Sequence, residues 1–100
     1  MKEALLKTFH LNNRDYLSML QRTKHAIVDF VASCGYYYDF KKYYPRLLTK
    51  HSNTECVVIR SIAINDGVVS LFDEYNRIYP LDDFDFHELN SLLEFIATYE

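Results

Sequence analysis

Two apolar, β-branched runs on either side of an Asn-Asp-Gly turn constrain the fold of this chain more than any other feature. The first run, CVVIRSIAI, ends at Ile64, and the second, VVSLFDEY, begins at Val68. Gly67 lies between the runs and tolerates a positive φ without a steric penalty. The pattern therefore predicts a β-hairpin.

A two-residue loop at Asp66-Gly67 gives the register that we expect for this hairpin. The resulting pairs are Ile64 with Val69, Ile62 with Leu71, Arg60 with Asp73, and Val58 with Tyr75. A three-residue loop is the alternative, and it would place Ile62 opposite Ser70. We prefer the two-residue loop because it groups apolar partners on one face and pairs opposite charges.

A second turn at Tyr75-Asn76 should return the chain as a third strand, since Asn tolerates the left-handed region better than most non-glycine residues. The expected pairs are Glu74 with Arg77 and Phe72 with Tyr79. Pro80 lacks the N–H that a central strand donates, so the third strand should end there or lie at an edge. Together the three segments predict a three-stranded antiparallel β-meander.

Apolar residues at three- and four-residue steps predict a long helix that ends at Gly35. The stripe consists of Tyr16, Met19, Leu20, Thr23, Ile27, Phe30, Val31 and Cys34. Asn12-Asn13 should cap this helix, with Asp15 in its first turn. Residues 1–9 have the composition of a separate, short helix.

A second amphipathic helix should begin after Asp85, which can act as N-cap with Glu88 three residues later in a capping-box arrangement. Its expected buried stripe is Phe86, Leu89, Leu92, Leu93 and Ile96. These elements predict a single small α+β domain over residues 1–100. In it, a three-stranded antiparallel β-meander is packed by a long N-terminal helix and a C-terminal amphipathic helix.

The segment 36–55 has two interpretations. Tyr36, Tyr38 and Phe40 alternate as they would in a strand, whereas residues 39–48 are compatible with a helical turn broken at Pro45. The sequence alone leaves both open.

The amino-acid composition is typical of a soluble, intracellular domain. The chain is 49% hydrophobic and 25% charged, and no segment approaches the roughly 20 apolar residues of a membrane span. Its first residues, MKEALLK, lack the apolar run of a signal peptide. We therefore expect a cytoplasmic protein without a membrane partner, and we expect Cys34 and Cys56 to be free, buried thiols.

Charge is divided unevenly along the chain. Residues 1–51 hold nine Lys and Arg against four Asp and Glu, and residues 52–100 hold two against ten, so the halves carry +5 and −8. Such asymmetry either steers a charged partner or a second copy of the chain, or is neutralised inside one fold. A contiguous acidic face on the second half would also suit a mimic of nucleic acid.

Aromatic rings interleaved with cations make the segment 36–50 the strongest candidate interaction surface. The chain has nine Tyr and no Trp, and five of these Tyr fall in this segment. Tyr and Arg are enriched at protein interfaces, and rings beside cations also stack bases and neutralise phosphates. The candidate residues are Tyr36, Tyr37, Tyr38, Lys41, Lys42, Tyr43, Tyr44, Arg46 and Lys50.

No pattern in the sequence indicates catalysis or a cofactor. Gly35 and Gly67 are the only glycines, so a glycine-rich phosphate loop is excluded. The four His and two Cys show no C-x-x-C or H-x-x-x-H spacing, so we expect no metal site. The acidic cluster is Asp82, Asp83, Asp85, His87 and Glu88. It lacks the spacing of a calcium loop and suits a helix N-terminus.

The sequence therefore predicts a non-catalytic protein-interaction or regulatory domain that binds no cofactor and associates with itself or with another protein. The alternative is a nucleic-acid-binding module that uses the Tyr- and Lys-rich segment 36–50. A third hypothesis is a small enzyme centred on the acidic cluster at 82–88.

Overall fold

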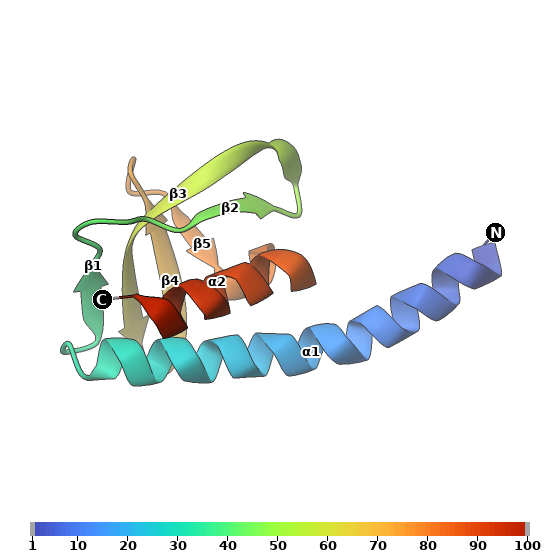
Figure 1. Cartoon of the computed structure of the whole chain (residues 1–100), viewed down its shortest axis with the longest axis horizontal. Helices are drawn as coiled ribbons and strands as arrows, with labels where there is room; N and C mark the ends of the chain where they lie inside the picture. The colour runs from blue at the N-terminus through green and yellow to red at the C-terminus, as the bar shows by residue number, and fades with distance from the viewer. Residues whose placement is uncertain (1, 100) are drawn as a thin grey trace.

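The computed structural model describes residues 2–99, and it describes the side chains of residues 14–51 and 55–99. Two helices lie side by side, and an antiparallel sheet of five strands packs over them (Figure 1). The elements are α1 (Lys2–Ala32), β1 (Tyr37–Asp39), β2 (Arg46–Thr49), β3 (Ser52–Asn65), β4 (Val68–Asp73), β5 (Ile78–Pro80), a 3-10 helix η1 (Leu81–Asp83) and α2 (Phe86–Thr98). This arrangement confirms the predicted α+β class, with five strands where the sequence predicted three.

α1 is a single helix of 31 residues, and its N-terminal end projects beyond the rest of the fold (Figure 1). The expected break near Asn12 and Asn13 is wrong, because the helical backbone runs through both residues. Asn costs less than about 0.7 kcal/mol in a helix interior, and no Gly or Pro interrupts this stretch. The expected side-chain caps at Asn12 and Asn13 lie outside the described side chains. Over the residues described, no helix combines the length and apolarity needed to cross a membrane.

The C-terminal end of α1 follows the sequence prediction. Gly35 takes a φ of 82°, and Tyr36 takes one of 66°. The backbone N–H of Tyr36 donates to the carbonyl of Val31 at 3.0 Å, which closes the last turn of the helix. The chain then turns directly into β1.

The predicted helical stripes form one hydrophobic core with the sheet. The buried members of these stripes are Met19, Thr23, Ile27 and Val31 in α1, and Leu89, Leu92 and Ile96 in α2. Two expected members lie outside the core, because Phe86 is 42% exposed at the first turn of α2 and Cys34 lies past the end of α1. Cys34 and Cys56 are both free, as predicted, but both are exposed rather than buried.

α1 and α2 run in the same direction. The Tyr16 hydroxyl, at the middle of α1, donates to the carbonyl of Phe84, just before α2, at 2.7 Å. Near the C-terminal ends of the two helices, the rings of Phe30 and Tyr99 lie 6.1 Å apart, edge to face. This ring contact places Tyr99 next to the C-terminal end of α1.

β3 is the central strand of the sheet, whereas a three-stranded meander would have placed the second strand of the hairpin in the middle. β3 pairs with β4 on one edge and with both β1 and β2 on the other, and β5 lies outside β4. The expected pairs Ile64–Val69 and Ile62–Leu71 are confirmed. Asp66 and Gly67 both take positive φ, which is the geometry of a two-residue hairpin loop.

A β-bulge at Arg60 changes the register beyond these pairs. The expected pairing of Arg60 with Asp73 is wrong, because Asp73 lies opposite Ile59 and Arg60 has no partner in β4. A bulge of this kind leaves one residue unpaired and bends its strand. The Arg60 guanidinium instead lies 5.4 Å from the ring centre of Tyr44.

The segment 36–55 supplies the two strands that the sequence left unassigned. The strand interpretation of the alternating aromatic residues holds for residues 37–39, and the helical interpretation of residues 39–48 is wrong. Residues 46–49 form a further strand that the sequence did not predict. Val58 consequently lies opposite Arg46 of β2, and its expected pairing with Tyr75 is wrong. Pro45 is tolerated just before β2 because it contributes only its carbonyl, which accepts the N–H of Ile59 at 2.9 Å.

The turn between β4 and β5 is one residue longer than predicted. Phe72 lies opposite Ile78 rather than Tyr79, and the N–H of Asp73 donates to the carbonyl of Arg77 at 3.1 Å. The loop thus contains three residues and ends at Asn76, which takes a φ of 65°. β5 ends at Pro80 on the edge of the sheet, as expected.

The first turn of α2 closes the outer edge of β2. Asp85 caps α2 as predicted, since its carboxylate accepts the N–H of Glu88 at 3.0 Å. The Glu88 carboxylate does not complete the capping box but accepts the backbone N–H of Leu48 in β2. The N–H of Lys50 donates to the carbonyl of Asp83 at 2.8 Å. The outward-facing amides of Leu48 and Lys50 are therefore bonded within the fold.

Replacing Glu88 by Ala should lower the free energy of unfolding by about 1–2 kcal/mol, because the half-buried N–H of Leu48 loses a charged acceptor. Urea denaturation followed by circular dichroism measures the change. Glu94→Ala, at an exposed position of the same helix, is the matched control and should alter stability by less than about 0.5 kcal/mol. Equal losses in the two variants would contradict the bonding role of Glu88.

Candidate interaction surface

Four of the nine predicted surface residues line one groove. Residues 42–46 form one side of it, and the C-terminal end of α2 forms the other. The lining residues are Lys42, Tyr43, Tyr44, Arg46, Phe95, Thr98 and Tyr99. The groove has a volume of about 670 Å³, and none of the described residues that line it is acidic. Four aromatic rings and two cations therefore meet in a single concave surface.

Four of the other predicted residues lie on the surface outside this groove. Tyr36, between α1 and β1, is 57% exposed, and Tyr37, the first residue of β1, is 52% exposed. Lys41 is exposed beside the groove without lining it. Lys50 follows the far end of β2, where its Nζ lies 4.2 Å from the ring centre of Tyr16. The predicted segment is therefore not one continuous binding surface.

The ninth residue, Tyr38, belongs to an aromatic cluster behind the groove. Its ring lies 4.8 Å from that of Phe30 and 5.3 Å from that of Phe40. Phe40 in turn contacts Phe95 at 5.6 Å and Tyr99 at 5.2 Å. All four contacts are edge to face, a geometry that stabilises aromatic pairs beyond their area of burial. Because Phe95 and Tyr99 belong to both sets, the cluster fixes one wall of the groove.

The Tyr99 hydroxyl anchors the loop that forms the opposite wall. It accepts the backbone N–H of Lys41 at 2.9 Å and that of Lys42 at 3.3 Å. Burial raises the pKa of Tyr99, but these two backbone hydrogen bonds stabilise the anion, and the net pKa lies below its ordinary value. The pKa of Tyr38 is raised by burial and by its contact with Tyr99. The end of α2 thus sets the position of the loop.

Sequence reasoning missed the half of the groove that α2 provides. Phe95, Thr98 and Tyr99 did not belong to the stripe predicted to face the core. The spacing of Phe95 and Tyr99 was the available signal, since residues four apart lie on the same side of a helix. Which segment this side would meet depends on tertiary packing.

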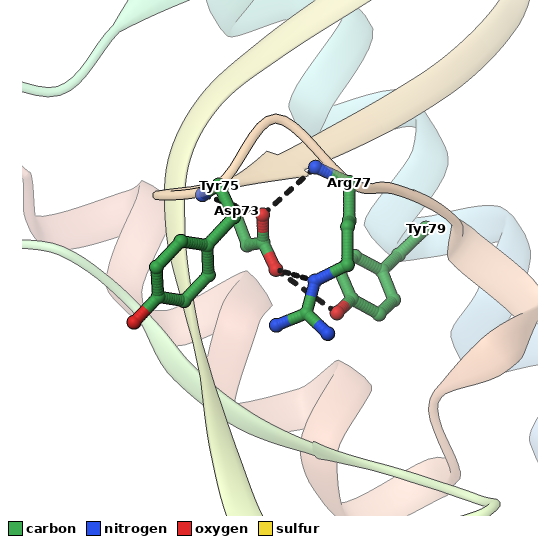
Figure 2. A network of polar contacts seen from close by, with 4 residues as sticks. All are labelled: Asp73, Tyr75, Arg77 and Tyr79. Carbon is green, nitrogen blue, oxygen red and sulfur yellow. Dashed lines mark hydrogen bonds and ion pairs between the residues drawn. The ribbon is translucent and has the colours of Figure 1, made fainter.

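A separate polar cluster surrounds Asp73 at the β4–β5 turn, and Figure 2 shows its four residues. Asp73 is only 3% exposed. Its carboxylate accepts the backbone N–H groups of Tyr75 and Arg77, both at 2.8 Å. It also accepts Nε of Arg77 at 2.9 Å and the Tyr79 hydroxyl at 3.0 Å. Four bonds use the acceptor capacity of a carboxylate, so this cluster stabilises a turn and offers no free base.

The titration of Asp73 follows from these bonds. Burial raises the pKa of Asp73, but the backbone hydrogen bonds from Arg77 and Tyr75 and the side-chain bonds from Tyr79 and Arg77 outweigh it. The pKa of the carboxyl therefore lies below its ordinary value. Burial and the bond to Asp73 raise the pKa of Tyr79.

The predicted acidic cluster at 82–88 is divided among structural contacts. Asp85 caps α2, and Glu88 accepts the amide of Leu48. The Asp83 carboxylate lies 3.3 Å from Nε2 of His51. Over the described part of the chain, no three His, Cys, Asp or Glu side chains gather closely enough to hold a metal ion.

Comparison with known proteins gives no match for this chain among family models, curated proteins or solved structures.

Replacing Asp73 by Asn should lower the free energy of unfolding by about 2–3 kcal/mol at neutral pH, because Asn keeps only one of the two oxygens that accept four half-buried hydrogen bonds. A carboxyl whose pKa is depressed by folding stabilises the protein above its unfolded pKa, and this stability is lost as the pH falls through the folded pKa. Below a pH of about 4, the wild type should therefore lose stability more steeply than the variant. Urea denaturation at several pH values measures both effects, and Glu74→Gln at the neighbouring exposed position is the control. Parallel pH profiles for wild type and Asp73→Asn would contradict the assignment.

Replacing Tyr99 by Phe removes the hydroxyl acceptor and keeps the ring in the aromatic cluster. The amides of Lys41 and Lys42 should then exchange with solvent about tenfold faster, which corresponds to the loss of about 1.4 kcal/mol of local protection. Hydrogen exchange measured by nuclear magnetic resonance tests this expectation. Tyr43→Phe alters an exposed ring of the same groove and should leave both rates unchanged. Unchanged exchange in Tyr99→Phe would show that the hydroxyl does not anchor the loop.

Proposed function

We propose that this protein is a non-catalytic interaction domain whose groove binds an extended, acidic segment of a partner protein. One observation carries the proposal, namely that four aromatic rings and two cations line a single concave surface. Aromatic rings and Arg supply most of the binding energy at protein interfaces, and complementary charge directs the encounter. The groove offers both to a chain that carries carboxylates and apolar side chains.

The exposure of the lining residues supports this proposal. Lys42 and Arg46 are exposed, and Tyr43 is 68% exposed, so the cations and one ring are accessible from solvent. The ring of Tyr44 is half-buried, and Arg60 lies over it. A third cation therefore borders the groove, and the positive charge is concentrated where an acidic segment would lie.

The backbone of the groove is held before any partner binds. At one end of the loop the N–H of Phe40 donates to the carbonyl of Arg60 at 3.0 Å, and at the other the carbonyl of Pro45 accepts the N–H of Ile59. Tyr99 anchors the middle. A preorganised loop loses less conformational entropy on binding, which favours affinity.

Single-stranded nucleic acid is the second candidate ligand. The exposed ring of Tyr43 lies between Lys42 and Arg46 in the sequence, and all three line the groove. A base can stack on such a ring while the cations neutralise the flanking phosphates. This mode differs from peptide binding in its steep dependence on salt.

Lys42→Glu combined with Arg46→Glu should weaken binding to the groove at least tenfold, which is about 1.4 kcal/mol. The probes are a fluorescent peptide of alternating Glu and Tyr and a fluorescent dodecamer of thymidine, each titrated by anisotropy at low and high salt. Arg22→Glu combined with Lys24→Glu makes the same charge change on the exposed side of α1 and is the matched control.

Peptide binding that only the groove variant weakens would support the protein-interaction function. Tighter binding of the dodecamer, lost with increasing salt and in the groove variant alone, would favour nucleic acid instead. If neither probe binds, or if both double variants weaken binding equally, the groove is not the binding site.

A further inference from the structure

β3 is longer than each of the strands that pair with its two edges. β4 pairs with β3 only from Ile59 to Asn65, and β2 pairs with the other edge of β3 from Ser52 to Val58. Over the described residues, no strand pairs with the edge of Glu55–Val58 that faces away from β2. We call this stretch the open edge. Figure 1 shows that the ribbon formed by β2 and the first half of β3 bends away from β4, which leaves the open edge at the outside of the sheet.

The direction of the backbone groups follows from the alternation of a strand. The N–H of Ile59 points to β2, because it donates to the carbonyl of Pro45. Backbone groups of successive residues point to opposite edges, so those of Val57 also face β2. The N–H and C=O groups of Cys56 and the N–H of Val58 therefore face the open edge. These are the groups that a further strand would bond.

The outer edges of β2 and β5 are blocked by devices that the open edge lacks. The outer edge of β2 is bonded by Glu88 and by the carbonyl of Asp83. The edge strand β5 is only three residues long and ends at Pro80, which has no N–H. Natural proteins protect edges in these ways against pairing with another chain. The open edge carries no Pro or Lys, and its Val57 and Val58 are half-buried, apolar and β-branched.

We propose that a second copy of this chain pairs with the open edge, antiparallel about a twofold axis at Cys56. Cys56 then lies opposite Cys56 of the second copy, and Glu55 lies opposite Val57 of the second copy. The two sheets join into one, and each open edge is covered by the other. A twofold arrangement is self-complementary and closed, so it yields a dimer rather than a filament.

Charge on either side of the open edge favours a second copy as the occupant. The turn after β2, beyond one end, carries Lys50, which is exposed. The β4–β5 turn, beyond the other end, carries Glu74, which is also exposed. Antiparallel pairing directs the Lys50 end of each ribbon toward the Glu74 turn of the other copy. Opposite charges therefore approach one another twice, once on each side of the axis.

The test measures molar mass by light scattering after size exclusion, at concentrations from about 10 to 500 µM, which span the affinities of small interfaces. The wild type should shift from one chain toward two as concentration rises. Cys56→Pro should remain monomeric, because it removes an N–H that points to the open edge and leaves the bonds to β2. Cys56→Ser keeps the N–H and should dimerise like the wild type.

A covalent experiment tests the register without depending on the proline variant. In a hydrogen-bonded antiparallel pair the Cα atoms are about 5.5 Å apart, which is within the range of about 4.4–6.8 Å that a disulfide spans. Oxidation of Cys34→Ser with diamide should therefore join two chains through Cys56. Cys56→Ser, in which the exposed Cys34 remains, should give far less covalent dimer under the same conditions.

Three results would overturn the proposal: a monomer at every concentration, a dimer that Cys56→Pro retains, or equal covalent dimer in the two single-cysteine variants. If circular dichroism shows that Cys56→Pro does not fold, the covalent experiment decides. Lys42→Glu with Arg46→Glu should dimerise normally, so failure at the groove and failure at the open edge are distinguishable.

Discussion

The pairing of β3 with three other strands is the interaction on which the rest of the structure depends. β3 has fourteen residues, and the bulge at Arg60 divides it into two parts. Its second part pairs with β1 and β4, whereas its first part pairs with β2 alone. Because a bulge bends the strand that contains it, the first part leaves the plane of the hairpin. This bend brings β2 to the first turn of α2, where Glu88 meets Leu48.

Three side-chain oxygens complete the fold at the points where strand pairing stops. Glu88 bonds an outer amide of β2, the Tyr99 hydroxyl bonds two amides after β1, and the Asp73 carboxylate bonds two amides after β4. A buried or half-buried amide without a partner costs about 1–3 kcal/mol. This cost applies to the half-buried amides that Glu88 and Asp73 accept, whereas the amides that Tyr99 accepts are exposed. Each of these three residues also lies in or next to a helix or strand that contributes side chains to the hydrophobic core.

The sequence predicted the features that depend on a few neighbouring residues. The Asp66-Gly67 hairpin, the end of α1 at Gly35 and the Asp85 cap are all decided by local backbone geometry, and all are confirmed. The predicted two-residue turn between β4 and β5 was wrong. The buried carboxylate of Asp73 accepts amides of the turn and thereby favours a loop of three residues.

Features that depend on distant partners were the ones that sequence reasoning missed. β1 and β2 are short, and they exist as strands because β3 is beside them, so their own residues left a helical alternative open. The bulge at Arg60 has no local signal, since no Gly marks it. For the same reason the sequence predicted the Lys42–Arg46 side of the groove and not the side that α2 provides.

The groove and the open edge are both consequences of the bulge, and they lie on opposite edges of β3. The bulge releases Arg60 from β4, and its guanidinium lies over Tyr44 at the groove. It also turns the first half of β3 away from β4 (Figure 1), and the edge of Glu55–Val58 is left without a paired strand. Because the groove adjoins the β1–β2 side and the open edge is on the β4 side, occupation of one does not block the other. A dimer joined through the open edge would therefore carry two grooves. A partner with two acidic segments would bind this dimer more tightly than it binds a single domain, because the first bound segment raises the effective concentration of the second at the other groove.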